Sequence, residues 1–170
     1  SPALQVFLGL VVGAVLVWSG EWVRRRASSA MDKTTNYVPA ALSAAGLAIL
    51  FASIYAAYAL YVLVAPTTAF IGMALVGMGS LALSRWQGPL IAALGLIGSY
   101  VTPALIPSAD PNAWGFFPYL LIILAASFAT MRGRTWWWLA YAAIAGSAAW
   151  TFLWIQSGTF EPVDVWPVGL

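Results

Sequence analysis

The segment VPAALSAAGLAILFASIYAAYALYVLV, residues Val38–Val64, contains no Asp, Glu, Lys, Arg or His from its first residue to its last. A helix of about 20 apolar residues crosses the roughly 30 Å of hydrocarbon in a bilayer, and this segment exceeds that length. It lacks the alternation of apolar and polar residues that membrane β-strands show. The segment therefore predicts a transmembrane α-helix that tilts or extends into the interface.

Five further apolar segments resemble the first, so the sequence predicts an all-α fold, a polytopic transmembrane helix bundle of about six membrane-spanning helices. The composition agrees, because 62% of the residues are hydrophobic and only 7% are charged, whereas about 25% are charged in soluble domains. Since the chain opens at Ser1 directly into an apolar run, we interpret it as one section of a longer protein. The predicted helices cover roughly residues 3–19, 38–64, 68–83, 89–106, 114–131 and 136–155.

The basic residues all fall in alternate connections between these helices, and hence on one face of a six-helix arrangement. Lys and Arg resist translocation, so this face is predicted to be cytoplasmic and both ends of the chain extracytoplasmic, N-out/C-out. Asp110, Glu161 and Asp164 fall on the opposite face. The basic residues are Arg24, Arg25, Arg26 and Lys33 in the first connection, Arg85 in the third, and Arg132 and Arg134 in the fifth.

Composition also narrows the chemistry. The chain has no Cys and no His, so it lacks the commonest general base and the commonest transition-metal ligands. The predicted helices hold no ionisable side chain in their interior, which argues against a proton-coupled pathway within them. We therefore predict no catalytic residue, no cofactor and no metal site, and lean against an enzyme. No basic surface patch of the kind that binds nucleic acid is present.

The predicted helix 89–106 is the most unusual, because it contains Gly95-Leu-Ile-Gly-Ser-Tyr-Val-Thr-Pro103. A proline inside a helix removes the hydrogen bond to the carbonyl four residues earlier, here that of Ser99. In one interpretation the helix is broken and Ser99, Tyr100, Thr102 and Pro103 line a polar pocket. In the other, which we favour, the helix merely kinks near its end and packs through Gly95 and Ser99.

Two tyrosines in the outer half of the helix 38–64 are further candidates for this pocket. Tyr55, Tyr58 and Phe51 share one helix face. Together with Tyr100 they are suited to line a site for a lipid or another apolar ligand. Aromatic packing and anchoring at the interface also explain these tyrosines, and we prefer that explanation.

Small residues four apart predict close approach between helices, because backbones approach where side chains are small. The pairs are Ala41 and Ala45, Ala44 and Ala48, Ala52 and Ala56, Ala142 and Gly146, and Ala145 and Ala149.

The run from Glu21 to Arg26 is predicted to continue the first helix into the cytoplasm. Glu21 is spaced to meet Arg24 and Arg25 at three and four residues. Arg24, Arg25 and Arg26 are candidates for contact with anionic lipid headgroups, at about 1 kcal/mol per basic residue. The simpler explanation is that these arginines anchor the end of the membrane-spanning helix on the cytoplasmic side.

Several of these stretches resemble a known family. They are Gly20-Glu-Trp-Val-Arg-Arg-Arg26, the run Tyr37-Val-Pro-Ala-Ala-Leu-Ser-Ala-Ala-Gly46 continuing to Tyr61, Gly95–Pro103, and Asn112–Tyr119. The chain is similar, from about Gly9 to Trp154, to the large polytopic predicted membrane proteins grouped as domain of unknown function 2339. Trp22 and Val23 depart from the Leu usual there. The resemblance implies a longer protein with many more helices, and it transfers no activity and no site residue.

The sequence is thus interpreted as a section of a larger protein of the bacterial inner membrane, with membrane lipids and other helices of the same chain as partners. Three functions stay open. The first is a structural or scaffold section without chemistry of its own. The second is a section of a transporter or lipid-handling protein whose path runs along Ser99, Tyr100, Thr102 and Pro103. The third is part of a membrane-embedded enzyme acting on lipid-linked substrates, using Asp110, Glu161 or Asp164. The oligomeric state is not predicted.

Overall fold

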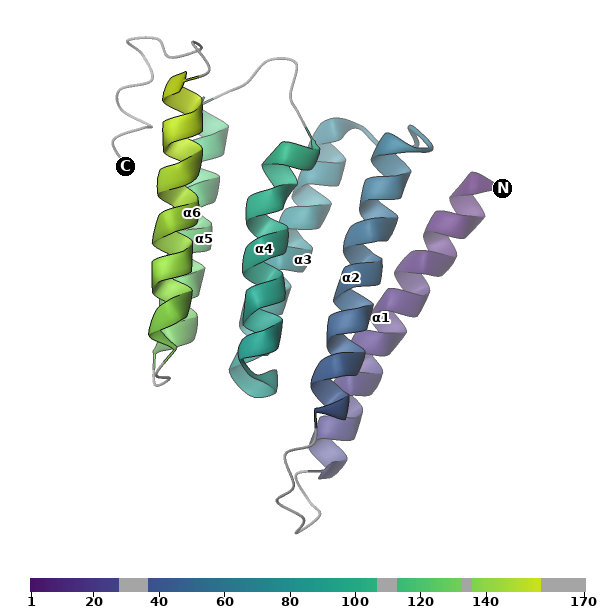
Figure 1. The fold of residues 1–170 in the computed structure, drawn as a ribbon. Helices are drawn as coiled ribbons and strands as arrows, with labels where there is room; N and C mark the ends of the chain where they lie inside the picture. The colour runs from purple at the N-terminus through teal and green to yellow at the C-terminus, as the bar shows by residue number, and fades with distance from the viewer. Residues whose placement is uncertain (28–36, 107–112, 133–135, 157–170) are drawn as a thin grey trace. The chain divides into compact units, whose positions relative to one another are not determined.

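The computed structural model describes residues 1–27, 37–106, 113–132 and 136–156 of the chain, and all regular structure in these ranges is α-helical (Figure 1). The prediction of an all-α fold with six helices is confirmed. The chain divides into an N-terminal unit, Ser1–Ile106, and a C-terminal unit, Pro107–Leu170. The helices are α1 (Pro2–Ala27), α2 (Val38–Ala59), α3 (Pro66–Gln87), α4 (Pro89–Leu105), α5 (Ala113–Met131) and α6 (Trp137–Gln156).

Five of these helices are long and apolar enough to cross a membrane, and α4 is shorter, with 17 residues. At 1.5 Å per residue α4 is about 26 Å long, which is close to the roughly 30 Å of hydrocarbon. Gly88, with φ of 103°, turns the chain directly from α3 into α4. Since α4 returns antiparallel to α3, Ile106 at its end packs against Ala69 near the start of α3.

The structure corrects the predicted boundary at Val64. Helix α2 ends at Ala59, and Leu60 and Tyr61 both donate their N–H groups to the Ala56 carbonyl oxygen, at 3.0 Å each. Val62 then adopts a positive φ of 49°. Pro66 disfavours helical geometry at the preceding residue, so Ala65 is extended and α3 begins at the proline. Both α2 and α3 are therefore 22 residues long, instead of one long and one short helix.

Helices α1 and α2 pack closely through small residues, which we call the α1–α2 seam: Gly9, Gly13, Gly20, Ser43, Gly46 and Ser53. A Cβ on Gly46 would lie 2.6 Å from the Gly13 carbonyl oxygen. A Cβ on Gly20 would overlap the Ser43 hydroxyl and lie 2.7 Å from the Pro39 carbonyl oxygen. The two backbones are thus nearly in contact, as in other membrane helix pairs built on small residues.

Helices α3 and α4 also pack closely through small residues. We call these the α3–α4 seam: Gly77, Ser80, Gly95 and Ser99. A Cβ on Gly77 would overlap the Ser99 hydroxyl, and a Cβ on Gly95 would overlap the Ser80 hydroxyl. Each helix therefore contributes one glycine that receives a serine of its partner. This agrees with the prediction that α4 packs through Gly95 and Ser99.

The predicted alanine pairs of α2 contribute little to this packing. Ala41, Ala45, Ala48 and Ala52 are exposed, whereas Ser43, Gly46 and Leu47 are buried. Alanine occurs on every face of α2, so spacing alone did not identify the face that meets α1. The glycines, which allow the closest backbone approach, determine that face.

In the C-terminal unit, aromatic side chains join α5 to α6. The Phe116 ring stacks on Trp154 at 5.4 Å between centroids, and meets Trp150 edge-on at 5.5 Å. Phe117 meets Trp154 edge-on at 5.6 Å and is buried. Edge-to-face and offset rings at these separations attract each other beyond the area that they bury. These rings therefore hold the α5–α6 pair together.

Candidate functional site

Of the hydroxyls of the predicted polar pocket, that of Ser99 lies on the side of α4 that meets α3. Ser99 and Thr102 are both 0% exposed, and Ser99 packs over Gly77. Helix α4 continues past Pro103 to Leu105. The Thr102 hydroxyl donates to the Gly98 carbonyl oxygen at 2.7 Å, one residue before the carbonyl that Pro103 leaves unbonded. Tyr100 and Pro103 are half-buried.

The structure also places the tyrosines of α2 that were candidates for the same pocket. Tyr58 is half-buried and packs against a buried cluster of Ala69, Met73 and Ile106, at the end of the unit where α2 and α4 end and α3 begins. Phe51 fills the space beside Gly98, because a Cβ there would meet its ring. Tyr55 is half-buried too. The structure thus brings Tyr58 and the end of α4 into one apolar cluster, while Ser99 faces α3 and Thr102 is buried with its hydroxyl bonded to its own helix. The polar pocket stays a prediction.

A charged cluster occupies the C-terminal end of α1. The Glu21 carboxylate accepts hydrogen bonds from Arg24 at 2.6 and 2.8 Å and from Arg25 at 2.8 Å, as their spacing predicts. The Arg26 guanidinium lies 3.7 Å from the centre of the Trp22 ring, a cation–π contact. The Gln87 amide of α3 donates to Glu21 at 3.4 Å. The cluster therefore links the ends of α1 and α3 and places Arg85 at the same end of the unit as Arg24.

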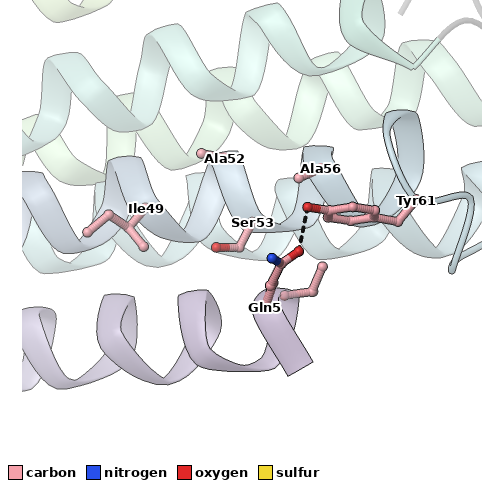
Figure 2. A pocket seen from close by; sticks show the side chains of 7 residues that line it. Gln5, Ile49, Ala52, Ser53, Ala56 and Tyr61 are labelled. Atoms are coloured by element: carbon pink, nitrogen blue, oxygen red, sulfur yellow. Dashed lines mark hydrogen bonds between the residues drawn. The ribbon is translucent and has the colours of Figure 1, made fainter. Parts of the chain in front are cut away.

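A groove between α1 and α2 was not predicted (Figure 2). It has a volume of about 240 Å³, and polar side chains line it at one end. The Tyr61 hydroxyl donates to Gln5 Oε1 at 2.8 Å, across the two helices. One signal in the sequence was Gln5 itself, an amide within an otherwise apolar run. Its partner Tyr61 lay inside the helix predicted to end at Val64, so the pair was not recognised.

Other buried hydroxyls of the described helices mostly bond within their own helix. Ser80 donates to the Gly77 carbonyl oxygen at 2.7 Å, Ser84 to Leu81 at 2.6 Å, and Ser127 to Ile123 at 2.8 Å. Ser43, beneath Gly20, has no hydrogen-bond partner among the described residues. No group of three or more acidic residues suited to hold a metal ion occurs in the part of the chain that the structure describes. Asp110, Glu161, Asp164, Lys33 and Arg134 lie outside the described residues.

Comparison with known proteins places this arrangement in a family. The model of the family described as "Predicted membrane protein (DUF2339)" matches residues 1–169, so the chain belongs to that family. No curated protein and no solved structure matches the chain. The family resemblance noted in the sequence is confirmed, and the chain is a predicted membrane protein with several helices suited to span a bilayer.

Proposed function

We propose that this member of the predicted membrane protein family is a structural section of a larger protein of the bacterial inner membrane, with no chemistry of its own. The observation that carries the proposal is the backbone contact in the two seams. A Cβ would lie 2.6 Å from a backbone oxygen at Gly46 and 3.1 Å from one at Gly95. Helices packed at this separation have little room to slide or rotate, which suits a fixed framework.

The proposed orientation is N-out/C-out. Its support is the hydrogen bond between Gln87 and Glu21, which brings the basic ends of α1 and α3 together. The basic residues of both ends then meet the cytoplasmic headgroups, as the distribution of Lys and Arg favours. Arg24, Arg25 and Arg26 outnumber the single carboxylate of Glu21 in the cluster, so a net positive charge is available to anionic lipids.

Accessibility to water distinguishes the structural section from its main alternative, a transporter or lipid-handling section with a path along Ser99, Tyr100, Thr102 and Pro103. The chain has no native cysteine, so Ser99→Cys and Thr102→Cys each introduce a unique thiol in it. We expect neither to react with a membrane-impermeant maleimide before denaturation. Leu60→Cys is the matched control, since Leu60 is exposed just after α2 and should react at once. Rapid labelling at both Ser99 and Thr102 would refute the structural proposal.

The third hypothesis, an enzyme acting on lipid-linked substrates, relies on Asp110, Glu161 or Asp164. An essential carboxylate predicts that Asp110→Asn or Asp164→Asn abolishes a phenotype at unchanged protein level. If either variant does so, the section has chemistry of its own, and the structural proposal fails.

A further inference from the structure

The groove between α1 and α2 lies where the two helices diverge toward the N-terminus of α1 (Figure 1). Its floor is formed by Ile49, Ala52 and Ala56 of α2, and its polar end by Gln5, Ser53 and Tyr61 (Figure 2). Its volume of about 240 Å³ is below the roughly 300–1,000 Å³ of small-molecule sites. The groove is therefore suited to a narrow part of a ligand.

With α1 and α2 spanning a bilayer, as proposed, the groove runs along both helices from the end at which they leave the hydrocarbon. Tyr61 follows the end of α2, and Gln5 lies in the first turns of α1, so both side chains are at the depth where helices leave the hydrocarbon. Ile49 precedes Ala56 by seven residues, about 10 Å along the helix. The apolar floor therefore extends from the interface into the hydrocarbon, as an acyl chain of a lipid does.

The polar end offers hydrogen-bond donors. Because the Tyr61 hydroxyl donates to Gln5 Oε1, the amide oxygen is occupied and the amide –NH2 group is left on the side of Ser53 (Figure 2). The Ser53 hydroxyl lies over Gly9. No acceptor for either donor is found in the part of the chain that the structure describes. At the interface such donors take their acceptors from outside the chain, and a lipid that enters the groove brings an acceptor with it.

We propose that the groove binds one acyl chain of a diacyl phospholipid, and that an ester carbonyl of this lipid accepts hydrogen bonds from the Gln5 amide and the Ser53 hydroxyl. Ester carbonyls are the acceptors that a phospholipid presents between its headgroup and its chains. Tyr61 is a positioning residue that orients the Gln5 amide. With the proposed N-out orientation, the bound lipid lies in the outer leaflet. The binding site itself does not depend on that orientation.

Photo-crosslinking of the full protein in vesicles of phosphatidylethanolamine and phosphatidylglycerol tests this site. The probe is a diester phosphatidylglycerol with a diazirine on one acyl chain, compared with its dialkyl ether analogue, which has no ester carbonyl. We expect the diester probe to label the segment from Ile49 to Ala56 preferentially. The ether probe should label it about fivefold less per hydrogen bond lost. This comparison uses the unchanged protein, so it does not depend on how a variant folds.

Substitutions identify the donors. Gln5→Leu should reduce labelling by the diester probe about fivefold, part of the way to the level of the ether probe, which also loses the bond from Ser53. It should not reduce labelling by the ether probe further. Ala52→Leu fills the groove and should abolish preferential labelling by both probes. Ala82→Leu is the control, since Ala82 is exposed on α3, outside the groove.

Equal labelling by the two probes, or labelling spread evenly over the exposed faces of α1 and α2, would overturn the proposal. So would rapid reaction of Ser53→Cys with an aqueous maleimide, because it would show a water-filled groove. Vesicle labelling is independent of chain orientation and of the seams between other helices. If the labelling experiment fails, the lipid site is refuted, but the structural proposal is still decided by the cysteine experiment at Ser99 and Thr102.

Discussion

Replacing Gly46 by alanine tests the close packing of α1 and α2 directly. The new Cβ would lie 2.6 Å from the Gly13 carbonyl oxygen and 2.8 Å from both the backbone nitrogen and the Cγ2 atom of Val17. A carbon atom contacts a carbonyl oxygen comfortably at about 3.3 Å or more, so the helices must separate by about 0.7 Å. Two of the three obstacles are backbone atoms, so a side-chain rotation cannot relieve the clash.

The expected magnitude combines two opposing effects. Alanine is favoured over glycine inside a helix by about 1 kcal/mol, which stabilises the variant. Overpacking of a close interface costs about 1–3 kcal/mol. Gly79 provides the matched control, because it lies in the interior of α3 and no atom lies within 4 Å of where its Cβ would be. We expect Gly79→Ala to be neutral or stabilising, and Gly46→Ala to be about 1–3 kcal/mol less stable than Gly79→Ala.

The free energy of unfolding is measured by titrating the purified protein with sodium dodecyl sulfate in mixed micelles, and following tryptophan fluorescence. The comparison of two Gly→Ala variants cancels the change in helix propensity, so the difference reports the local packing. If Gly46→Ala unfolds at the same detergent fraction as Gly79→Ala, the backbone contact at Gly46 is absent and the argument for a rigid section fails.

Four further predictions follow from other parts of the structure. Reporter fusions after Arg26 and after Leu63 should report opposite sides of the membrane, cytoplasmic for the first. An extracytoplasmic signal after Arg26 would refute the N-out orientation, and the same side for both would show that α2 does not cross the membrane. Glu21→Gln should lower the free energy of unfolding by about 0.5–1 kcal/mol in the same titration, because the ion pairs with Arg24 and Arg25 are partly exposed. Gln156→Glu, at the exposed end of α6, is the control. An unchanged midpoint in Glu21→Gln would contradict a stabilising cluster. Changing Arg24, Arg25 and Arg26 together to Gln should reduce the enrichment of anionic lipid that copurifies with the protein by about 1 kcal/mol per charge, and retained enrichment would exclude these residues as headgroup contacts. Phe116→Ala should destabilise the α5–α6 pair by about 1–3 kcal/mol, because it removes the ring contacts with Trp150 and Trp154, whereas Trp114→Ala, which removes an exposed ring, should change thermal stability in detergent far less.

Much of the fold was predictable, because hydropathy reports which residues lie in lipid. Helices α4, α5 and α6 begin and end within a residue of the predicted positions. The error lies between α2 and α3, where Leu60, Tyr61, Val62, Leu63 and Val64 are all apolar although they form a turn. An apolar turn at the interface has no hydropathy signal, and only Pro66 indicates that one helix has ended and another begins.

The candidate sites were less predictable, for a related reason. In lipid, apolar side chains gain nothing from meeting each other rather than meeting acyl chains, so hydrophobicity does not identify the face on which two helices pack. Packing is decided instead by backbone approach, and a glycine on one helix is informative only once its partner is known. Gly77 and Ser99 are far apart in sequence, and so are Gln5 and Tyr61. Sequence spacing within one helix therefore could not reveal either pair.

The same physics distinguishes the two kinds of polar group in this protein. Ser80 of the α3–α4 seam and Ser84, one turn further along α3, donate to carbonyl oxygens of their own helix, so they are satisfied whatever surrounds them. Gln5 lies on the exposed surface, and only its oxygen is engaged. A polar group satisfied within its helix serves packing, whereas a donor left facing lipid requires an acceptor from the bilayer. A section whose helices pack this closely, and whose groove has an apolar floor with donors at one end, is therefore suited to hold a lipid in a fixed position.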